Sequence, residues 1–254
     1  MKFKQIRNAI HQSLLCGDST IKSRGRHAYF YFMGKYKVLY RTGVMSFFDY
    51  PCWELENAGV GYFFKHKPQR GDTVIDAGAF VGHMTVFLAK IVGPEGSVIA
   101  FEPDPTNYER LIKNINLNKL DNVTPINSAL WNKSGKMSLC LNGLGSRIVE
   151  NGDSSTDDTI DVSTVRADEI LESLGVENIQ YVKMDVEGAE EKALEGFGKY
   201  LDSPDLKLAI ATYHVVNGEI TARSVESLFK SRGFNTSTEF DKHLSTYAWK
   251  EETD

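Results

Sequence analysis

A glycine turn between a short strand and a helix constrains this fold more than any other stretch of the sequence. Residues 73–75 form a β-branched run that is typical of a buried strand, and Asp76 ends it. Gly78 and Gly82 follow, and an apolar pattern with helical spacing continues to the Gly-Pro pair at residues 93–94. The pattern predicts a strand, a tight turn and a helix in immediate succession.

A second strand completes this unit. Residues 98–101 are an apolar run that ends at an acid, Glu102. A strand, a glycine turn, a helix and a strand with a terminal acid are typical of the nucleoside-binding half of a doubly wound sheet. The alternative is that the two glycines only allow the helix to pack closely on the strand.

The chemistry of the turn separates two kinds of nucleotide. A dinucleotide fingerprint is Gly-x-Gly-x-x-Gly, whereas this turn reads Asp-x-Gly-x-x-x-Gly and lacks the middle glycine. The carboxylate of Asp76 would repel a pyrophosphate, but it suits the ammonium and sulfonium groups of S-adenosylmethionine. Glu102 would accept charge-assisted hydrogen bonds from both ribose hydroxyls. The turn therefore favours S-adenosylmethionine over NAD.

Composition excludes several other classes of protein. The chain has 254 residues, 41% of them hydrophobic, and a formal net charge of −5, whereas nucleic-acid-binding domains are usually basic. Its cysteines, Cys16, Cys52 and Cys140, are odd in number and widely spaced, which argues against a disulfide framework. No stretch has the length of a membrane span or the apolar core of a signal peptide. We expect a cytoplasmic protein without a nucleic-acid partner; the oligomeric state cannot be inferred.

The rest of the chain predicts one large domain with an extension before it. Residues 1–70 are expected to form an N-terminal helical and β extension, whose aromatic segment at residues 47–54 is either a lid or ordinary packing. Residues 71–254 are expected to form the main domain, with a β insertion at about residues 133–164 that contains strands at residues 137–141 and 159–163 and a polar loop between them. A helix is expected over residues 191–201. Five further strands are expected in this domain, at residues 123–130, 179–184, 206–213, 234–239 and 244–249. The last two form a closing antiparallel hairpin on a mostly parallel, seven-stranded Rossmann-like sheet.

Candidate site residues follow the carboxyl ends of the strands, where open α/β sheets bind their ligands. Ser128 and Ala129 are expected beside an adenine. Asp185, Glu187 and His214 are expected to converge on a substrate, with His214 as a general base because histidine titrates near neutral pH. In the alternatives Asp185 only contacts a cofactor, Glu187 caps the next helix and His214 is a satisfied strand-end residue. A divalent metal on Asp185 and His214 is possible, but no compact ligand motif favours one.

Three blocks carry a resemblance to the FkbM family of class I S-adenosylmethionine-dependent O-methyltransferases. They are Val-Ile-Asp-Ala-Gly-Ala-Phe-Val-Gly at residues 74–82, Ala-Phe-Glu-Pro-Asp-Pro at residues 100–105 and Lys-Met-Asp-Val-Glu-Gly-Ala-Glu at residues 183–190. The third block is the narrower mark of the family, and the resemblance covers roughly residues 71–214. Thr212 departs from the pattern, because many members have an acidic residue two positions before the histidine, which puts in doubt any mechanism that needs a carboxylate there.

The resemblance implies a methyltransferase that acts on a hydroxyl of a small molecule or glycan. Its implied cofactor-binding residues are Asp76, Gly78, Ala79, Phe80, Gly82, Glu102, Pro103, Ser128, Ala129 and Asp185, and its implied catalytic residues are His214, Asp185 and Glu187. Two other functions stay open. One is an NAD-dependent or other nucleotide-using enzyme, and the other is an S-adenosylmethionine-binding domain without catalysis.

Overall fold

A computed structural model describes residues 20–24, 27–32, 36–41, 61–141, 146–149, 159–240 and 243–250. For the strands between residues 20 and 41, only the backbone is described. The expected N-terminal helix, the aromatic segment at residues 47–54 and the polar loop at residues 150–158 lie outside these ranges.

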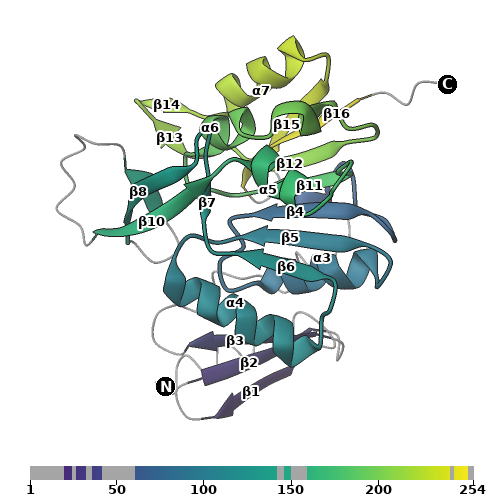
Figure 1. The fold of residues 1–254 in the computed structure, drawn as a ribbon, viewed down its shortest axis with the longest axis vertical. Helices are drawn as coiled ribbons and strands as arrows, with labels where there is room; N and C mark the ends of the chain where they lie inside the picture. Colours follow the sequence, from purple (N-terminus) through teal and green to yellow (C-terminus); the bar gives the residue numbers. More distant parts are fainter. Residues whose placement is uncertain are drawn as a thin grey trace.

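A seven-stranded sheet forms the centre of the molecule, as the sequence predicted (Figure 1). Its spatial order is β15-β16-β12-β11-β4-β5-β6, and all its pairings are parallel except those made by β16. The strands are β4 (Thr73–Ala77), β5 (Ser97–Phe101), β6 (Val123–Ile126), β11 (Tyr181–Met184), β12 (Lys207–Ala211), β15 (Asn235–Phe240) and β16 (Leu244–Trp249). This is the class I doubly wound arrangement closed by an antiparallel hairpin.

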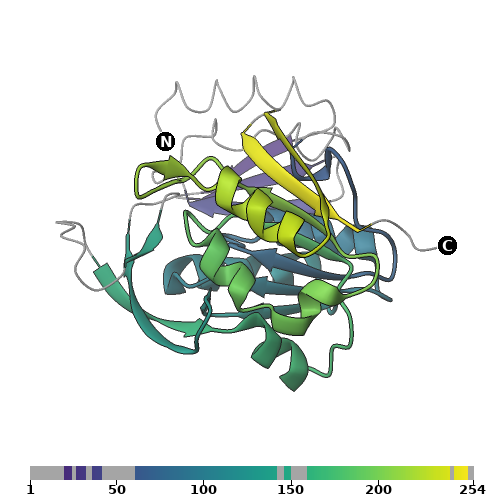
Figure 2. The ribbon, with the colours of Figure 1, turned by 90° about the horizontal axis from the view of Figure 1, so that it is seen from above.

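Helices cover both faces of this sheet, and a separate apolar core fills each side. One face carries α3 (His83–Val92), α4 (Pro105–Asn118) and the 3-10 turn η1 (Gly61–Phe63). The other carries α5 (Ala167–Ser173), α6 (Glu190–Glu195), the 3-10 helix η3 (Gly198–Asp202) and α7 (Ala222–Ser231). Figure 2 shows the second group, in green and yellow, in front of the sheet. Both faces of the strands are buried, which explains their continuous apolar sequences.

Local sequence explains where α4 begins and ends. The side chain of Asp104 accepts hydrogen bonds from the backbone N–H groups of Thr106 and Asn107, and Pro105 occupies the first helical position. Lys119 ends the helix in the left-handed conformation, at φ 53°.

Two sequence predictions need correction. The strand expected over residues 123–130 stops at Ile126, because the chain turns at Asn127 and Ser128; β7 (Ala129–Leu130) then joins a different sheet. The helix expected over residues 191–201 is broken after α6, where Gly196 packs so closely on the backbone of Trp131 that a Cβ there would lie 2.2 Å from the carbonyl oxygen.

The expected β insertion forms a second, four-stranded sheet in the order β7-β10-β8-β9. Its remaining strands are β8 (Gly135–Cys140), β9 (Arg147–Val149) and β10 (Thr159–Val165). The strands β8 and β10 were expected, whereas β9 was not, because it lies beside the polar tract that indicated a loop.

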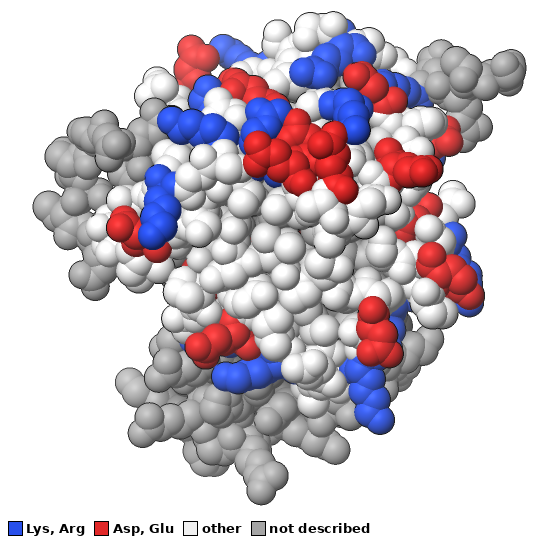
Figure 3. Space-filling model, viewed as in Figure 1, with Lys and Arg blue, Asp and Glu red and all other residues white. Residues whose placement is uncertain are grey.

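Residues before the main domain contribute a three-stranded antiparallel sheet, β1 (Thr20–Arg24), β2 (His27–Phe32) and β3 (Tyr36–Arg41), that lies beside α4 (Figure 1). A two-stranded hairpin, β13 (Val215–Val216) and β14 (Glu219–Ile220), follows β12. On the face seen in Figure 3, charged residues gather toward the top and edges with both signs adjacent, and the middle is largely uncharged. Among the described residues, no helix is long and apolar enough to cross a membrane.

Candidate functional site

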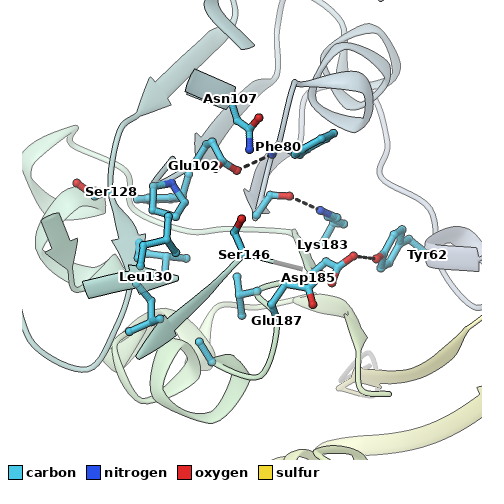
Figure 4. A pocket seen from close by; sticks show the side chains of 18 of the residues that line it. Tyr62, Phe80, Glu102, Asn107, Ser128, Leu130, Ser146, Lys183, Asp185 and Glu187 are labelled. Carbon is cyan, nitrogen blue, oxygen red and sulfur yellow. Dashed lines mark hydrogen bonds between the residues drawn. The ribbon is translucent and has the colours of Figure 1, made fainter. Parts of the chain in front are cut away.

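A pocket lies at the carboxyl ends of β4, β5 and β11, where the sequence analysis placed the site (Figure 4). Its lining includes seven residues that the sequence predicted to bind the cofactor: Gly78, Phe80, Glu102, Pro103, Ser128, Ala129 and Asp185. Glu187, which was predicted to be catalytic, lines it as well. Asp76, Ala79, Gly82 and His214 lie behind this lining, and each of them is buried or nearly so.

Gly78 forms the floor of the pocket because its backbone meets that of β11. Its N–H donates to the carbonyl of Phe101, its φ is +78°, and a Cβ at this position would lie 1.8 Å from the backbone oxygen of Asp185. Only glycine fits such a contact in this conformation. The glycine turn therefore joins the two strand ends that carry Glu102 and Asp185.

Asp76 lies beneath the turn and is not part of the pocket lining, so its expected contact with the cofactor stays a prediction. The strand β4 extends to Ala77, so the side chain of Asp76 falls on the face that packs against α3. There it is fully buried and accepts a hydrogen bond of 2.6 Å from Thr85. Its Oδ1 lies 3.1 Å from the Nζ of Lys183, its register partner on β11. Lys183 also donates to the carbonyl of Gly78 at 2.8 Å, so the buried ion pair holds the turn.

Glu102 stabilises the other side of the turn through hydrogen bonds. Its two carboxylate oxygens accept hydrogen bonds from the backbone N–H groups of Phe80, at 2.7 Å, and Asp104, at 3.0 Å. Burial raises the pKa of Glu102 to about 7, although these two hydrogen bonds act in the opposite direction. Phe80 has a φ of 52°, a left-handed conformation that its hydrogen bond to Glu102 helps to hold.

The raised pKa gives Glu102 a specific pH signature. Between its ordinary pKa of 4.5 and about 7, the folded protein binds more protons than the unfolded chain, so stability falls as pH rises through this window. Across this window the unfolding free energy falls by about 3 kcal/mol. We expect Glu102→Gln to flatten the pH dependence of the unfolding free energy, measured by urea titration, in this range. Glu109→Gln, on the exposed side of α4, should leave the pH dependence of the unfolding free energy unchanged. If the unfolding free energy of Glu102→Gln varied with pH as steeply as that of the parent protein, the raised pKa of Glu102 would be contradicted.

The second end of the pocket is built from the segment after β6. Asn127 donates to the carbonyls of Glu102, at 2.8 Å, and Pro103, at 3.2 Å, which brings Ser128 and Ala129 to the pocket wall. Glu102 lies at this end with Ser128, whereas Asp185 and Glu187 lie toward the other end (Figure 4). This lining fits S-adenosylmethionine, whose ribose hydroxyls can donate to a carboxylate and whose sulfonium and ammonium groups are cationic.

Four side chains form an acid–imidazole cluster next to the pocket: Asp185, Glu187, Glu190 and His214. The Nε2 of His214 lies 3.5 Å from Asp185 Oδ1 and 3.3 Å from Glu187 Oε2. Its Nδ1 lies 2.8 Å from Oε1 of Glu190, a fully buried carboxylate. Asp185 follows β11, Glu187 sits in the next turn at φ 54°, and His214 comes after β12. The sequence-predicted catalytic residues are thus brought together by adjacent strands, β11 and β12.

The charge state of His214 differs from the sequence expectation. Burial alone lowers the pKa of His214, but its three carboxylate neighbours outweigh burial and raise the pKa to about 10. These carboxylates therefore favour the imidazolium form of His214 when no cation is bound to Nε2. The role of His214 as a general base stays a prediction.

Several pocket residues were not identified from the sequence. The hydroxyl of Tyr62, in η1, donates to Asp185 Oδ2 at 2.8 Å (Figure 4). The insertion contributes Leu139, Ser146 and Ile148 to the pocket wall, and Tyr213 and His243 also line it. Glu190 belongs to the third sequence block, but only its contact with His214 gives it a role. No sequence signal could have found Tyr62, because its partner is 123 positions away.

Comparisons with known proteins agree with this geometry. A family model described as the methyltransferase FkbM domain matches residues 76–238. The chain is 32% identical over 139 residues to the hexuronic acid methyltransferase AglP of Haloferax volcanii, covering 54% of each protein. It is 27% identical over 154 residues to the methyltransferase sdnD of Sordaria araneosa, covering 48% of this chain and 59% of sdnD. The matched segments thus span only about half the length of these two relatives.

The fold has a solved counterpart. The crystal structure of methyltransferase FkbM from Methylobacillus flagellatus superposes with a TM-score of 0.57 at 16% identity, covering 76% of this chain and 47% of that chain. At this level of identity the likeness concerns the fold alone.

Proposed function

The chain belongs to the family of FkbM methyltransferase domains, and from this premise we propose that it transfers a methyl group from S-adenosylmethionine to a hydroxyl of a small molecule or glycan. In this assignment residues 71–254 are the catalytic domain and residues 1–70 are an extension that packs on it. The position of β3 beside α4 supports that division.

The observation that carries the proposal is the acid–imidazole cluster at the edge of the nucleoside pocket. Asp185 and Glu187 line the pocket, and both lie against His214, which is held in place by Glu190. S-adenosylmethionine, when bound, supplies an activated methyl group, so the protein must supply orientation and a place for the proton that the acceptor loses. The pocket wall that includes Ser128 and Ala129 would orient the cofactor, and the carboxylates of Asp185 and Glu187 are the groups that could take the proton.

The charges in the cluster assign roles to its members. With His214 in its imidazolium form, a carboxylate of Asp185 or Glu187 accepts the hydroxyl proton, and the imidazolium stabilises that carboxylate in its ionised form. Tyr62 holds one oxygen of Asp185 and leaves the other facing His214. The hydroxyl of the acceptor therefore enters between Asp185 and Glu187, with its hydrogen directed at one of them.

The same charges disfavour a polyanionic acceptor. Glu102, Asp185 and Glu187 give the lining three carboxylates against the one ammonium group of Lys183. Such a lining disfavours a phosphate backbone, which supports a small molecule or glycan as the partner. The name of the relative AglP makes hexuronic acids the first acceptor class to test, and within them the hydroxyl oxygens are the proposed sites.

Calorimetric titration with S-adenosylmethionine, and separately with NAD, tests the cofactor. We expect micromolar binding of S-adenosylmethionine alone, because the turn lacks the glycine pattern of a dinucleotide site. Binding of NAD alone would establish a different nucleotide-using enzyme.

Transfer of labelled methyl groups to hexuronic acids and neutral hexoses tests the reaction. We expect a base-stable methyl ether, since the proposed acceptor is a hydroxyl; a label released by mild base would indicate a methyl ester and contradict that choice. Glu187→Gln should slow transfer by about 10²- to 10⁴-fold with little change in cofactor affinity. The matched control Glu191→Gln, an exposed residue four positions further along, should transfer at the parent rate. Cofactor binding with no transfer to any acceptor would support the non-catalytic alternative.

A further inference from the structure

Two buried polar atoms in the acid–imidazole cluster face each other without a hydrogen bond. The Nε2 of His214 and the Oδ1 of Asp185 lie 3.5 Å apart, and neither forms a hydrogen bond with any described residue. His214 is only 8% exposed. Buried polar atoms in native proteins nearly always have a partner, because an unsatisfied one costs about 1–3 kcal/mol. The pair therefore requires a ligand that both atoms can bind.

Glu187 adds a third ligand atom at a suitable spacing. Its Oε2 lies 3.3 Å from His214 Nε2, and one ligand atom from each of Asp185, Glu187 and His214 lies within 4.8 Å of the others. Ligands at adjacent corners of an octahedron, each about 2.1 Å from the ion, are separated by about 3 Å. The two separations from His214 Nε2 are 3.3 and 3.5 Å, and all three lie within 4.8 Å, so side-chain rotations toward a common point would close the three residues on one ion.

The groups behind the three ligands also match a cation site. Histidine ligands usually present their second ring nitrogen to a carboxylate, which fixes the orientation of the ring. Here Glu190, fully buried, lies 2.8 Å from His214 Nδ1, which leaves Nε2 directed at Asp185 and Glu187. Tyr62 donates to Asp185 Oδ2 and thereby directs Oδ1 toward the same point.

We propose that Asp185, Glu187 and His214 bind a divalent cation at the edge of the pocket. The charge supports this, because three carboxylates surround one imidazole. The cation would bind the neutral imidazole, so its binding releases to solvent the proton that Nε2 carries in its absence. Two carboxylates with one imidazole suit Mn²⁺ best, since carboxylates prefer Mg²⁺, Ca²⁺ and Mn²⁺ while imidazole prefers later metals such as Zn²⁺.

A cation at this position would also bind the acceptor. Its open positions face the pocket, where a hydroxyl oxygen, or a hydroxyl and a neighbouring carboxylate of a sugar acid, would complete the coordination. This part of the inference rests on the proposed function, whereas binding of the cation does not.

Titration of the chelator-treated protein with MnCl₂ tests the proposal, with free Mn²⁺ followed by electron paramagnetic resonance. We expect one site with micromolar affinity, and competition by Zn²⁺. Glu187→Gln should weaken Mn²⁺ binding by about tenfold or more, and so should Glu190→Gln, which acts through the orientation of His214. The matched control Glu191→Gln should bind as the parent protein does. Thermal unfolding of each variant separates loss of the site from loss of the fold.

Absence of a single tight site in the folded parent protein for any of Mn²⁺, Mg²⁺ and Zn²⁺ would overturn the proposal, and so would equal weakening by Glu191→Gln. Titration of the same samples with S-adenosylmethionine distinguishes this failure from failure of the proposed function. Binding of S-adenosylmethionine without binding of Mn²⁺ would reject the cation site and support the proposed methyltransferase function. Binding of Mn²⁺ without binding of S-adenosylmethionine would support the cation site and reject the proposed function.

Discussion

Replacing Gly78 by alanine should destabilise the protein by about 2–5 kcal/mol and abolish the heat of S-adenosylmethionine binding. The left-handed conformation of Gly78, at φ +78°, costs a residue with a Cβ about 1–2 kcal/mol. The new Cβ would also lie 1.8 Å from the backbone oxygen of Asp185, and overpacking of this kind costs about 1–3 kcal/mol more. Because the opposing atom belongs to the backbone, relief requires β4 and β11 to move apart, which opens the floor of the pocket.

Gly233→Ala is the matched control for this prediction. Gly233 has the same φ of +78°, but a Cβ there would have no atom within 4 Å. We expect this variant to lose about 1–2 kcal/mol, the conformational part alone, and to keep full cofactor affinity. Urea denaturation and calorimetry measure both quantities. Equal destabilisation of the two variants would show that the close approach of Gly78 to Asp185 has no energetic consequence.

Replacing Lys183 by methionine should cost about 3–5 kcal/mol of unfolding free energy. Lys183 is 3% exposed and its partner Asp76 is fully buried, so the substitution leaves a buried carboxylate with only the hydroxyl of Thr85 to stabilise it. It also removes the hydrogen bond to the carbonyl of Gly78. Urea denaturation at neutral pH measures the change.

Two further variants show whether the buried charge causes this loss. The double variant Asp76→Asn with Lys183→Met removes both charges and should recover a large part of the stability, because neutral side chains tolerate burial better than a single carboxylate. Arg70→Met breaks the Arg70–Glu95 pair, whose N–O distance of 2.7 Å is shorter but whose side chains are 69% and 57% exposed. Arg70→Met should therefore lower the unfolding free energy by only about 0–1 kcal/mol. If Lys183→Met cost no more than Arg70→Met, the pair with Asp76 would not support the turn.

The sequence was sufficient for the local elements of the sheet. The β-branched run of β4, the glycines after it and the apolar run of β5 depend on neighbouring residues, and all were found where the sequence predicted them. The closing hairpin of β15 and β16 was predicted for the same reason. The sequence also located Glu102 in the pocket wall, because its place at the end of a parallel strand determines the edge that it reaches.

Properties of the site that depend on distant residues needed the tertiary structure. Asp76 turned out to be buried because β4 runs on to Ala77, and its partner Lys183 comes from the register with β11, more than one hundred residues along the chain. The pKa of His214 is raised because Asp185, Glu187 and Glu190 surround it.

Sequence alone therefore determined the order of the elements and the edge of the sheet where the pocket lies, since both follow from local periodicity and strand direction. Only the tertiary structure decided which charges meet at that edge, because the pairing of strands and the electrostatic environment of a side chain depend on residues that are close in space and distant in the chain.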